Sequence, residues 1–258
     1  MTVDIHISEM GRGVPAVLIP GLGYASWFWQ SQDSLAGNHR LLKVDPRGAG
    51  RSPKPFGPYS IDGMASDIAA AISEAGPVHV VGHSMGGYLA QSLATHHPGL
   101  VRSITLVSTS RGGSDHDPVP EDTRSKWLAE SQRPPEEYAR ATMPLSFRPG
   151  WPEQNPDRYE DLLARRLRHP TPLEAWQAQF EACEVFLETG ADAAAIGQPA
   201  LIIHGDADRV VLVDNGRRLA KTIPDARFVV FEGAGHLVPV EEAERFNRTL
   251  LDFWREHE

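Results

Sequence analysis

Residues 78–87 of this 258-residue chain read VHVVGHSMGG. The stretch opens with a valine-rich run typical of a buried strand, and the residues after it favour a helix. Between the two, Gly82, Ser84 and Gly86 form the pattern G-x-S-x-G, a sharp turn that exposes the serine hydroxyl while its glycines let strand and helix approach each other. Glycine-rich turns also bind phosphates, but this one has neither the Lys-Ser/Thr of a P-loop nor a G-x-G-x-x-G pattern. Ser84 is therefore the candidate nucleophile.

Other apolar runs extend the strand pattern along the chain. Those that are nearly continuous in apolarity and rich in β-branched residues are 17–19, 41–44, 104–107, 201–203 and 228–231. Strands of this kind are buried on both faces. An alternating run of Val3, Ile5 and Ile7 predicts a half-exposed edge strand, and apolar residues at helical spacing predict helices between the strands. The chain is therefore predicted to be α/β, with a mostly parallel central sheet and helices on both faces.

Residues 111–197 interrupt this alternation, because they offer no buried strand and contain helical stretches separated by prolines. A structureless loop of this length is uncommon in a compact domain. We therefore expect a core domain made of 1–110 and 198–258, with 111–197 inserted as a helical cap over the end of the sheet. An extra helical layer without a covering role is the alternative. Aromatic residues of the insertion can line a pocket or simply pack in a core; with one methionine, the candidates are Trp127, Tyr138, Met143, Phe147, Trp151 and Trp176.

The charge balance excludes some classes of partner. The chain has 25 Lys and Arg against 34 Asp and Glu, a net charge of −9. An acidic chain without a basic tract lacks what phosphate-backbone binding needs, so we expect no nucleic-acid partner. No apolar run is long enough to span a bilayer and the first residues do not resemble a signal peptide, so we expect no membrane association and a cytoplasmic location. Cys183, the single cysteine, lies in an apolar stretch and is predicted to be a packed, unreactive thiol.

A serine hydroxyl is a weak nucleophile, so it needs an imidazole base that a carboxylate orients. Of the 11 histidines, His236 lies in a glycine-rich turn, residues 233–236, directly after the last predicted strand. Most of the others lie within a strand, end a helix or belong to the terminal tail. His83 adjoins the serine but is expected to point elsewhere. His236 is therefore the predicted base.

The acid is expected in the loop that follows the next-to-last predicted strand. Asp206 comes directly after that strand and could form the turn by accepting hydrogen bonds from loop amides. Asp208 lies further into the loop, where its carboxylate can reach back toward His236, and it is the preferred acid. Asp115 and Asp117, in the loop after an earlier strand, are a second option, although Gly and Ser residues separate them from the strand.

A tetrahedral oxyanion needs two hydrogen-bond donors. The backbone N–H of Met85, the residue after the serine, supplies one, and the glycine-flanked loop 20–24 can present the N–H of Leu22 as the other. The same loop sequence also fits a plain turn between a strand and a helix. Cysteine and histidine do not occur together at metal-ligand spacing, so we expect neither a metal nor a cofactor.

Together these motifs resemble the α/β-hydrolase superfamily, across nearly the whole chain outside the insertion. They are Pro-Gly-Leu-Gly at 20–23, Asp-Pro-Arg-Gly-Ala-Gly-Arg-Ser at 45–52, the G-x-S-x-G turn at 82–86, Gly-Asp-Ala-Asp at 205–208 and Gly-His at 235–236. The resemblance implies a serine hydrolase fold with a helical cap inserted after the sixth core strand. It also implies that the acid lies in the loop after Gly205 at Asp208, and that the turn at 45–52 braces the core. The chain departs from many relatives at Pro20-Gly21, where they have His-Gly.

Within the superfamily, the chain resembles small capped carboxylesterases and enol-lactone hydrolases. This implies a serine hydrolase that cleaves a carboxylic ester or lactone of a small, largely apolar substrate through an acyl-enzyme intermediate. Epoxide hydrolases and haloalkane dehalogenases are disfavoured, because they use aspartate where this chain has Ser84. Carbon–carbon bond hydrolases and cofactor-free perhydrolases carry similar triads and are alternatives. A ligand-binding receptor with slow or no turnover is an alternative from another class.

Overall fold

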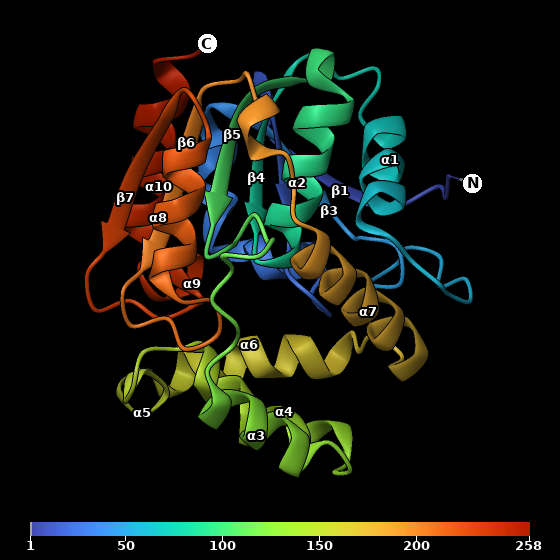
Figure 1. Cartoon of the computed structure of the whole chain (residues 1–258), viewed down its shortest axis with the longest axis vertical. Coiled ribbons are helices and arrows are strands. Elements are labelled where there is room, and N and C mark those ends of the chain that lie inside the picture. The colour runs from blue at the N-terminus through green and yellow to red at the C-terminus, as the bar shows by residue number, and fades with distance from the viewer. Residues whose placement is uncertain (1) are drawn as a thin grey trace.

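The structure, a computed structural model, describes residues 2–258. Its centre is a seven-stranded sheet in the order β1-β3-β2-β4-β5-β6-β7 (Figure 1). β1 runs antiparallel to β3, and the other neighbours are parallel. The strands are β1 (Ile7–Met10), β2 (Val14–Ile19), β3 (His39–Val44), β4 (Val78–His83), β5 (Val101–Val107), β6 (Ala200–Gly205) and β7 (Ala226–Phe231). The predicted α/β class with a mostly parallel sheet is confirmed.

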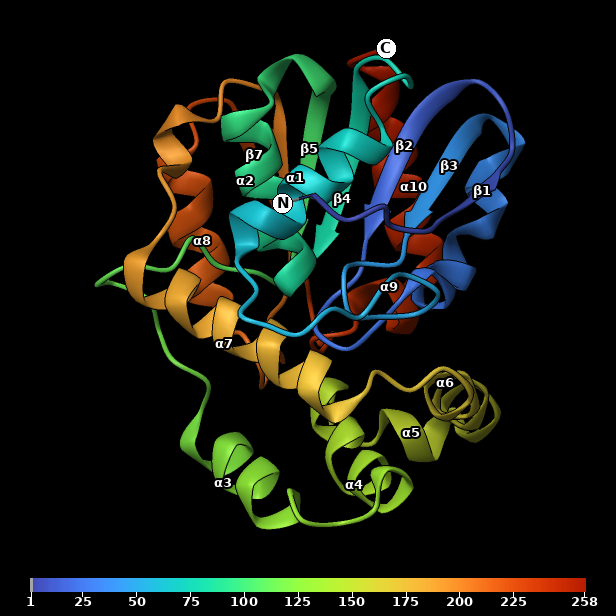
Figure 2. The ribbon, with the colours of Figure 1, turned by 90° about the vertical axis from the view of Figure 1, so that its right-hand side faces the viewer.

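Helices cover both faces of the sheet (Figures 1 and 2). They are η1 (Ser26–Gly37), α1 (Ile61–Ala71), α2 (Met85–His96), η2 (Pro98–Leu100), α8 (Val213–Thr222), α9 (Val238–Glu241) and α10 (Ala243–Arg255). One apolar cluster joins the sheet to α1, α2 and α8, and a second joins it to η1 and α10. Successive strand residues alternate between them, since Val17 and Val80 belong to the first cluster and Leu18 and Val81 to the second. This two-sided burial explains why the strands are apolar throughout.

The segment between β5 and β6 is helical. Its helices are α3 (Glu121–Glu130), α4 (Pro135–Thr142), η3 (Met143–Ser146), α5 (Trp151–Gln154), α6 (Pro156–Arg168), α7 (Leu173–Thr189) and η4 (Ala193–Ala195). Figure 1 shows α3 to α6 beyond the end of the sheet where the parallel strands finish, and α7 returns to contact α1 and α2. The segment follows β5, the fifth strand of the chain, and not the sixth as expected. The sixth position was what the family resemblance implied. Within residues 2–258, five strands precede the helical segment, and β1 is the only one of them before β2.

The predicted edge strand over residues 3–7 begins later than expected, at Ile7. The preceding backbone donors are taken by side chains. The Val3 N–H donates to the Asp67 carboxylate at 2.7 Å, and the His6 N–H donates to the Ser52 hydroxyl at 2.8 Å. Because these N–H groups are already bonded, regular pairing with β3 starts only at Ile7, opposite Val44.

The turn at 45–52 braces the core, as the family resemblance implies. The buried Asp45 carboxylate accepts hydrogen bonds from the N–H groups of Ser26 at 2.7 Å and Arg51 at 2.8 Å. The Ser52 hydroxyl donates to the Asp45 carbonyl at 2.5 Å. A buried carboxylate is costly unless its oxygens are hydrogen-bonded. These bonds therefore fix the turn at the end of β3 to the start of η1.

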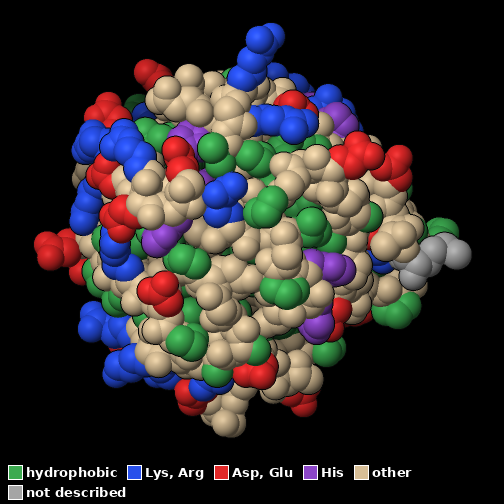
Figure 3. Space-filling view, turned by 90° about the horizontal axis from the view of Figure 1, so that it is seen from above, with side chains coloured by type: hydrophobic (Ala, Val, Ile, Leu, Met, Phe, Trp, Pro, Cys, Tyr) green, Lys and Arg blue, Asp and Glu red, His purple; other side chains and the backbone are tan. Residues whose placement is uncertain are grey.

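The end of the molecule opposite α3 to α6 carries mixed charges (Figure 3). Acidic and basic side chains are interspersed there, and apolar ones are scattered between them. Within residues 2–258, we find no helix with the length and apolarity needed to cross a membrane. The candidate catalytic residues lie at the other end of the sheet, where the strands meet the helical segment.

Candidate active site

Ser84 stands at the junction of β4 and α2. Its backbone angles, φ 55° and ψ −121°, lie outside the regions that L-residues usually adopt. Strain of this kind costs on the order of 1–3 kcal/mol and persists only where the surroundings enforce it. A Cβ on Gly82 would overlap the Gly86 carbonyl oxygen, and a Cβ on Gly86 would overlap the Ile19 carbonyl oxygen. The two glycines thus permit the tight packing that presents the serine at the end of β4.

The structure brings His236 and Asp208 together. His236 Nδ1 lies 2.8 Å from Asp208 Oδ2, and Asp208 Oδ1 accepts the N–H groups of Val210 at 2.7 Å and Val211 at 2.9 Å. His204 Nε2 lies 3.3 Å from Asp208 Oδ2. Burial alone would raise the pKa of Asp208, but the hydrogen bonds and charges of His236 and His204 outweigh it and hold the pKa below its usual value. Asp208 is therefore an ionised carboxylate that fixes the orientation of the His236 ring.

His83, next to Ser84, is hydrogen-bonded to the backbone of His236, the predicted base. Its Nε2 lies 3.0 Å from the His236 carbonyl oxygen, which can only accept, so Nε2 carries the proton. The two rings lie 4.8 Å apart. Burial and the neighbouring His236 lower the pKa of His83 to about 3, so its ring stays neutral. His83 therefore anchors the backbone of His236 without adding a charge.

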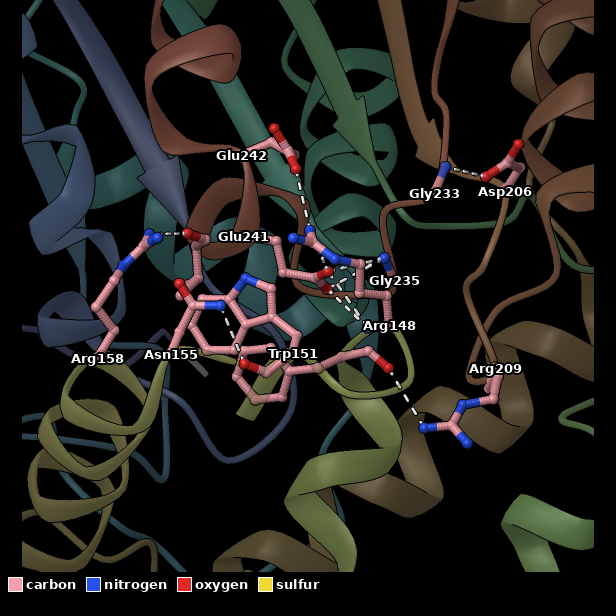
Figure 4. Close-up of polar contacts among 12 residues, drawn as sticks. Arg148, Trp151, Asn155, Arg158, Asp206, Arg209, Gly233, Gly235, Glu241 and Glu242 are labelled. Carbon is pink, nitrogen blue, oxygen red and sulfur yellow. Dashed lines mark hydrogen bonds and ion pairs between the residues drawn. The ribbon is translucent and has the colours of Figure 1, made fainter. Parts of the chain in front are cut away.

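The other candidate acids lie elsewhere. Asp206 is exposed, and its carboxylate accepts the N–H of Gly233 at 2.6 Å, so it ties together the loops after β6 and β7 (Figure 4). Asp115 pairs with Arg111 at 2.6 Å, and Asp117 pairs with Arg218. None of the three carboxylates contacts His236 in the described structure. The geometry thus favours the choice of Asp208 made from the sequence.

The loop after β2 lies against the turn that carries the serine. It forms a tight turn in which the Tyr24 N–H donates to the Gly21 carbonyl at 3.1 Å, and a Cβ on Gly21 would lie 3.2 Å from Ser84 Cβ. Leu22 lies within this turn and lines the same cavity as Ser84. Met85 is the first residue of α2, where backbone N–H groups have no acceptor within the helix. Both predicted oxyanion donors therefore belong to segments that adjoin Ser84.

Gln179, from α7, connects the helical segment to this loop. Its Oε1 accepts the N–H of Gly23 at 3.1 Å, and its Nε2 donates to the Arg47 carbonyl at 2.7 Å. The side chain is fully buried. Buried polar groups are normally hydrogen-bonded, and here each end of the amide is bonded to a different loop of the core. No local pattern in the sequence marks Gln179 as part of the site.

Ser84 and His236 line one cavity of about 120 Å³. Of the aromatic and methionine side chains expected around it, Trp127, Tyr138, Met143 and Trp176 line it. Phe147 and Trp151 are not among the lining residues; they are buried and stack on each other with ring centroids 4.5 Å apart. Lining side chains that the sequence analysis missed include Tyr24, Thr142, Arg166, Phe180 and Val210. Helical spacing could have indicated Phe180, one turn after Trp176 on α7, but no local pattern marks Arg166.

A larger hollow of about 470 Å³ lies between α1, α2 and α7 and does not reach Ser84. It contains a serine, a histidine and a carboxylate, since the Ser92 hydroxyl donates to Asp62 at 2.7 Å and lies 3.2 Å from His96 Nδ1. Ser92 lies in the interior of α2, where backbone N–H groups are used within the helix, so no oxyanion donors are available beside it. The smaller cavity is therefore the candidate active site.

Residues 144–148 of the helical segment are bonded to both loops that carry the predicted acid and base. Arg209, next to Asp208, donates through Nη2 to the carbonyls of Pro144 at 3.2 Å and Phe147 at 3.3 Å. The Leu237 N–H, next to His236, donates to the Ser146 carbonyl at 3.0 Å. The helical segment therefore helps to position the two loops.

Glu241, on α9, completes this connection (Figure 4). Its buried carboxylate accepts the N–H of Gly235 at 3.1 Å and the N–H of Arg148 at 3.3 Å, and Arg148 Nη1 lies 3.4 Å away. Burial raises the pKa of Glu241, although the bonds from Gly235 and Arg148 oppose this shift. One carboxylate thus joins the backbone just before His236 to the helical segment.

Two further expectations concern metal and thiol chemistry. In residues 2–258 no group of three or more His, Cys, Asp or Glu side chains is arranged to hold a metal ion. Cys183 is buried within α7, and burial raises the pKa of its thiol. Because the thiolate is the reactive form, a raised pKa makes this cysteine a poor nucleophile. The prediction of a packed thiol is confirmed.

Comparison with known proteins agrees with this geometry. The α/β hydrolase fold family matches residues 15–243. A protein of Azorhizobium caulinodans named "Putative carbamate hydrolase RutD" is 31% identical over 255 residues, which cover 97% of this chain and 94% of that protein. A 2-hydroxy-6-oxononadienedioate/2-hydroxy-6-oxononatrienedioate hydrolase of Burkholderia vietnamiensis is 29% identical over 264 residues, which cover 97% and 91%.

Solved structures show the same likeness. The enol-lactonase from Burkholderia xenovorans LB400 superposes with a TM-score of 0.83 at 26% identity, over 97% of this chain and 96% of that one. The residues that carry the motifs, including the turn at Ser84, all fall within the matched range. The chain belongs to the α/β hydrolase fold family.

Proposed function

We propose that the chain is a serine hydrolase that cleaves a carboxylic ester or lactone through an acyl-enzyme intermediate. One observation carries the proposal: Ser84, on a strained turn, lines the same cavity as His236, which is bonded at 2.8 Å to the buried Asp208. A hydroxyl, an imidazole and an ionised carboxylate are the groups that acyl transfer by serine requires. Membership of the family supports a hydrolase without naming the bond that it cleaves.

In the proposed mechanism, His236 takes the hydroxyl proton while the Ser84 oxygen bonds to the substrate carbonyl carbon. The carbonyl oxygen becomes an oxyanion that accepts the N–H groups of Leu22 and Met85. When the bond to the alcohol oxygen breaks, His236 returns the proton to that leaving oxygen. Water then attacks the acyl carbon while His236 takes its proton, the bond from that carbon to the Ser84 oxygen breaks, His236 returns the proton to this oxygen, and the free acid departs. Throughout, Asp208 holds Nδ1–H and stabilises the imidazolium that forms.

We also propose that residues 111–197 act as a cap on a core made of 1–110 and 198–258. Support comes from the cavity, whose wall combines Ser84 and His236 of the core with Trp127, Tyr138 and Trp176 of the helical segment. A pocket built from two parts of the chain lets the helical part determine which substrate fits, while the core performs the chemistry.

The names of two relatives point to other bonds as alternatives to the ester or lactone bond. One is named as a carbamate hydrolase and another as a hydrolase of a 2-hydroxy-6-oxo dienoic acid. A carbamate presents a carbonyl to the same serine, and a carbon–carbon hydrolase uses a similar triad on a ketone. Cofactor-free perhydrolysis, with peroxide in place of water, and simple ligand binding are the remaining alternatives.

Replacement of the nucleophile tests the mechanism. We expect Ser84→Ala to lower kcat for p-nitrophenyl acetate by on the order of 10⁴ or more with an unchanged melting temperature, since the covalent step is lost. A fluorophosphonate probe should label the wild-type chain once, at Ser84. An adduct on Ser92, or activity retained by Ser84→Ala, would refute the proposal.

A substrate panel then separates the bonds. Small ethyl esters and lactones, a phenyl carbamate, a 2-hydroxy-6-oxo dienoate and peroxide with acetate would be compared by kcat/KM. We expect the esters or lactones to rank first. A higher value for another substrate would move the assignment to that bond, and probe labelling without turnover of any of them would favour a receptor.

A further inference from the structure

The catalytic cavity contains one permanently charged side chain, Arg166 of α6. Apart from the two histidines, the other described lining residues are neutral, and no Asp or Glu is among them. Arginine stays protonated at every pH at which a protein is folded. The wall that faces the substrate therefore has a fixed positive charge that the proposed acyl transfer does not use.

Arg166 has no carboxylate partner within 4.0 Å in the part of the chain that the structure describes. Its neighbour Arg165 pairs with Asp161 at 2.7 Å, as expected for residues one helical turn apart. Arg166 instead has an aromatic partner: its guanidinium lies over the Tyr24 ring, 5.3 Å from the centroid, and Nη1 lies 3.3 Å from the Tyr24 hydroxyl. These contacts orient the guanidinium and leave its charge without a counter-ion.

The surroundings make this charge available to a ligand. Trp127, Tyr138 and Trp176 of the helical segment line the same cavity, and Arg166 itself is half-buried. A guanidinium in partly desolvated, aromatic surroundings attracts an anion more strongly than one in open water. The molecule as a whole carries a net charge of −9, so this attraction is local and works against the overall field.

Contact with Tyr24 positions the Arg166 guanidinium relative to the proposed oxyanion loop. Tyr24 ends the turn whose second residue, Leu22, is the proposed oxyanion donor, and its N–H bonds to Gly21 at 3.1 Å. Arg166 is thus held beside the loop that is expected to bind the reacting carbonyl. A substrate with its ester carbonyl at Ser84 would present a second functional group to Arg166 within the same cavity.

We propose that Arg166 binds a carboxylate carried by the substrate, separate from the group that is cleaved. The substrate class is then a half-ester of a dicarboxylic acid, or a lactone with a free carboxylate. Planar guanidinium and carboxylate groups form paired hydrogen bonds, which a lysine cannot reproduce. This inference rests on the proposed ester or lactone hydrolysis, and it replaces the small, largely apolar substrate expected from the sequence with one that carries a negative charge.

The test compares two esters of matched shape, monoethyl succinate and ethyl 4-methylpentanoate, in which an isopropyl group replaces the carboxylate. Hydrolysis is followed by titration of the released acid. For Arg166→Gln we expect kcat/KM to fall about 10- to 100-fold for monoethyl succinate, mainly through KM, because a charged hydrogen-bonded pair is lost. The value for the neutral ester should stay within about threefold, which also shows that the variant is folded.

Three further measurements complete the design. Arg166→Lys should recover part of the loss, and succinate should inhibit the wild-type chain competitively but Arg166→Gln much more weakly. Arg168→Gln, an exposed arginine on the same helix, is the matched control and should change neither ester. Equal losses on both esters, or unchanged succinate inhibition, would overturn the role of Arg166. If wild type and Ser84→Ala cleaved both esters equally, the proposed function itself would fail instead.

Discussion

Asp206 and Asp208 stand two residues apart and have different surroundings. The Asp208 side chain is fully buried and bonded to His236, whereas Asp206 is exposed and bonded to the N–H of Gly233. We expect Asp208→Asn to lower kcat by on the order of 10³ to 10⁴, because an amide favours the wrong tautomer of His236 and removes the charge that stabilises the imidazolium. Kinetics with p-nitrophenyl acetate measure this change.

Asp206→Asn is the matched control for that variant. It should keep kcat within a few-fold and lower the free energy of unfolding by about 0.5 to 1.5 kcal/mol, the worth of one hydrogen bond. The melting temperature follows this loss. An inactive but folded Asp206→Asn beside an active Asp208→Asn would reassign the acid.

Single functional residues can be predicted from the sequence when the residues next to them form a recognisable motif. Ser84 and His236 stand in glycine-rich turns directly after strands, so their positions follow from local pattern. Arg166, Glu241 and Gln179 do not, because their roles arise from contacts with residues far along the chain. Arg166 contacts Tyr24, which lies 142 positions earlier in the chain, and no sequence pattern connects two residues so far apart.

Among the structural elements, α9 has a role beyond packing, since its Glu241 joins the loop of His236 to Arg148. In Glu241→Gln, an amide NH₂ would replace one oxygen and face the N–H groups of Gly235 and Arg148. We expect the free energy of unfolding to fall by about 1–3 kcal/mol, the cost of unpaired buried polar groups, and kcat to fall about tenfold as the His236 loop loosens. Urea denaturation and steady-state kinetics measure the two effects.

Glu242→Gln provides the comparison, because Glu242 is only half-buried and bonds Arg148 Nη1 at 3.0 Å without touching the His236 loop. It should leave kcat unchanged. Equal effects of the two substitutions would show that Glu241 has no special part in holding the loop.

Some structural elements can be predicted from the sequence more accurately than others. Strands buried on both faces are found because each must be apolar throughout, as in β4 and β6. The start of β1 does not follow from the sequence, because alternation continues through Val3 and Ile5 while the side chains of Asp67 and Ser52 accept the nearby backbone N–H groups. Such side-chain competition depends on residues about 50 or more positions away and leaves no local trace.

For the whole molecule, two buried histidines should govern stability in mild acid. Burial lowers the pKa of both His79 and His83 to about 3, against an ordinary 6.5. Below 6.5 the unfolded chain takes up protons that the folded chain does not, so stability falls as the pH drops from 6.5 toward 3. Each histidine should cost about 2 kcal/mol at pH 5 relative to pH 8.

His79→Asn tests this without touching the active site, since His79 lies at the other end of β4 and its Nδ1 contacts Ser103 at 2.7 Å. The free energy of unfolding from urea titration should change less between pH 8 and pH 5 in this variant than in the wild type. His169→Asn, at an exposed site, should leave the pH dependence unchanged. An identical pH dependence in His79→Asn would show that its ring is protonated in the folded state.

The two hydrogen bonds of Gln179 connect the position of α7 to the geometry of the loop after β2. The side chain joins α7 to the Gly23 N–H and to the Arg47 carbonyl, so α7 cannot swing away from the core without releasing the turn that contains Leu22. A change in the position of α7 would therefore be transmitted to the turn that contains Leu22, the proposed oxyanion donor.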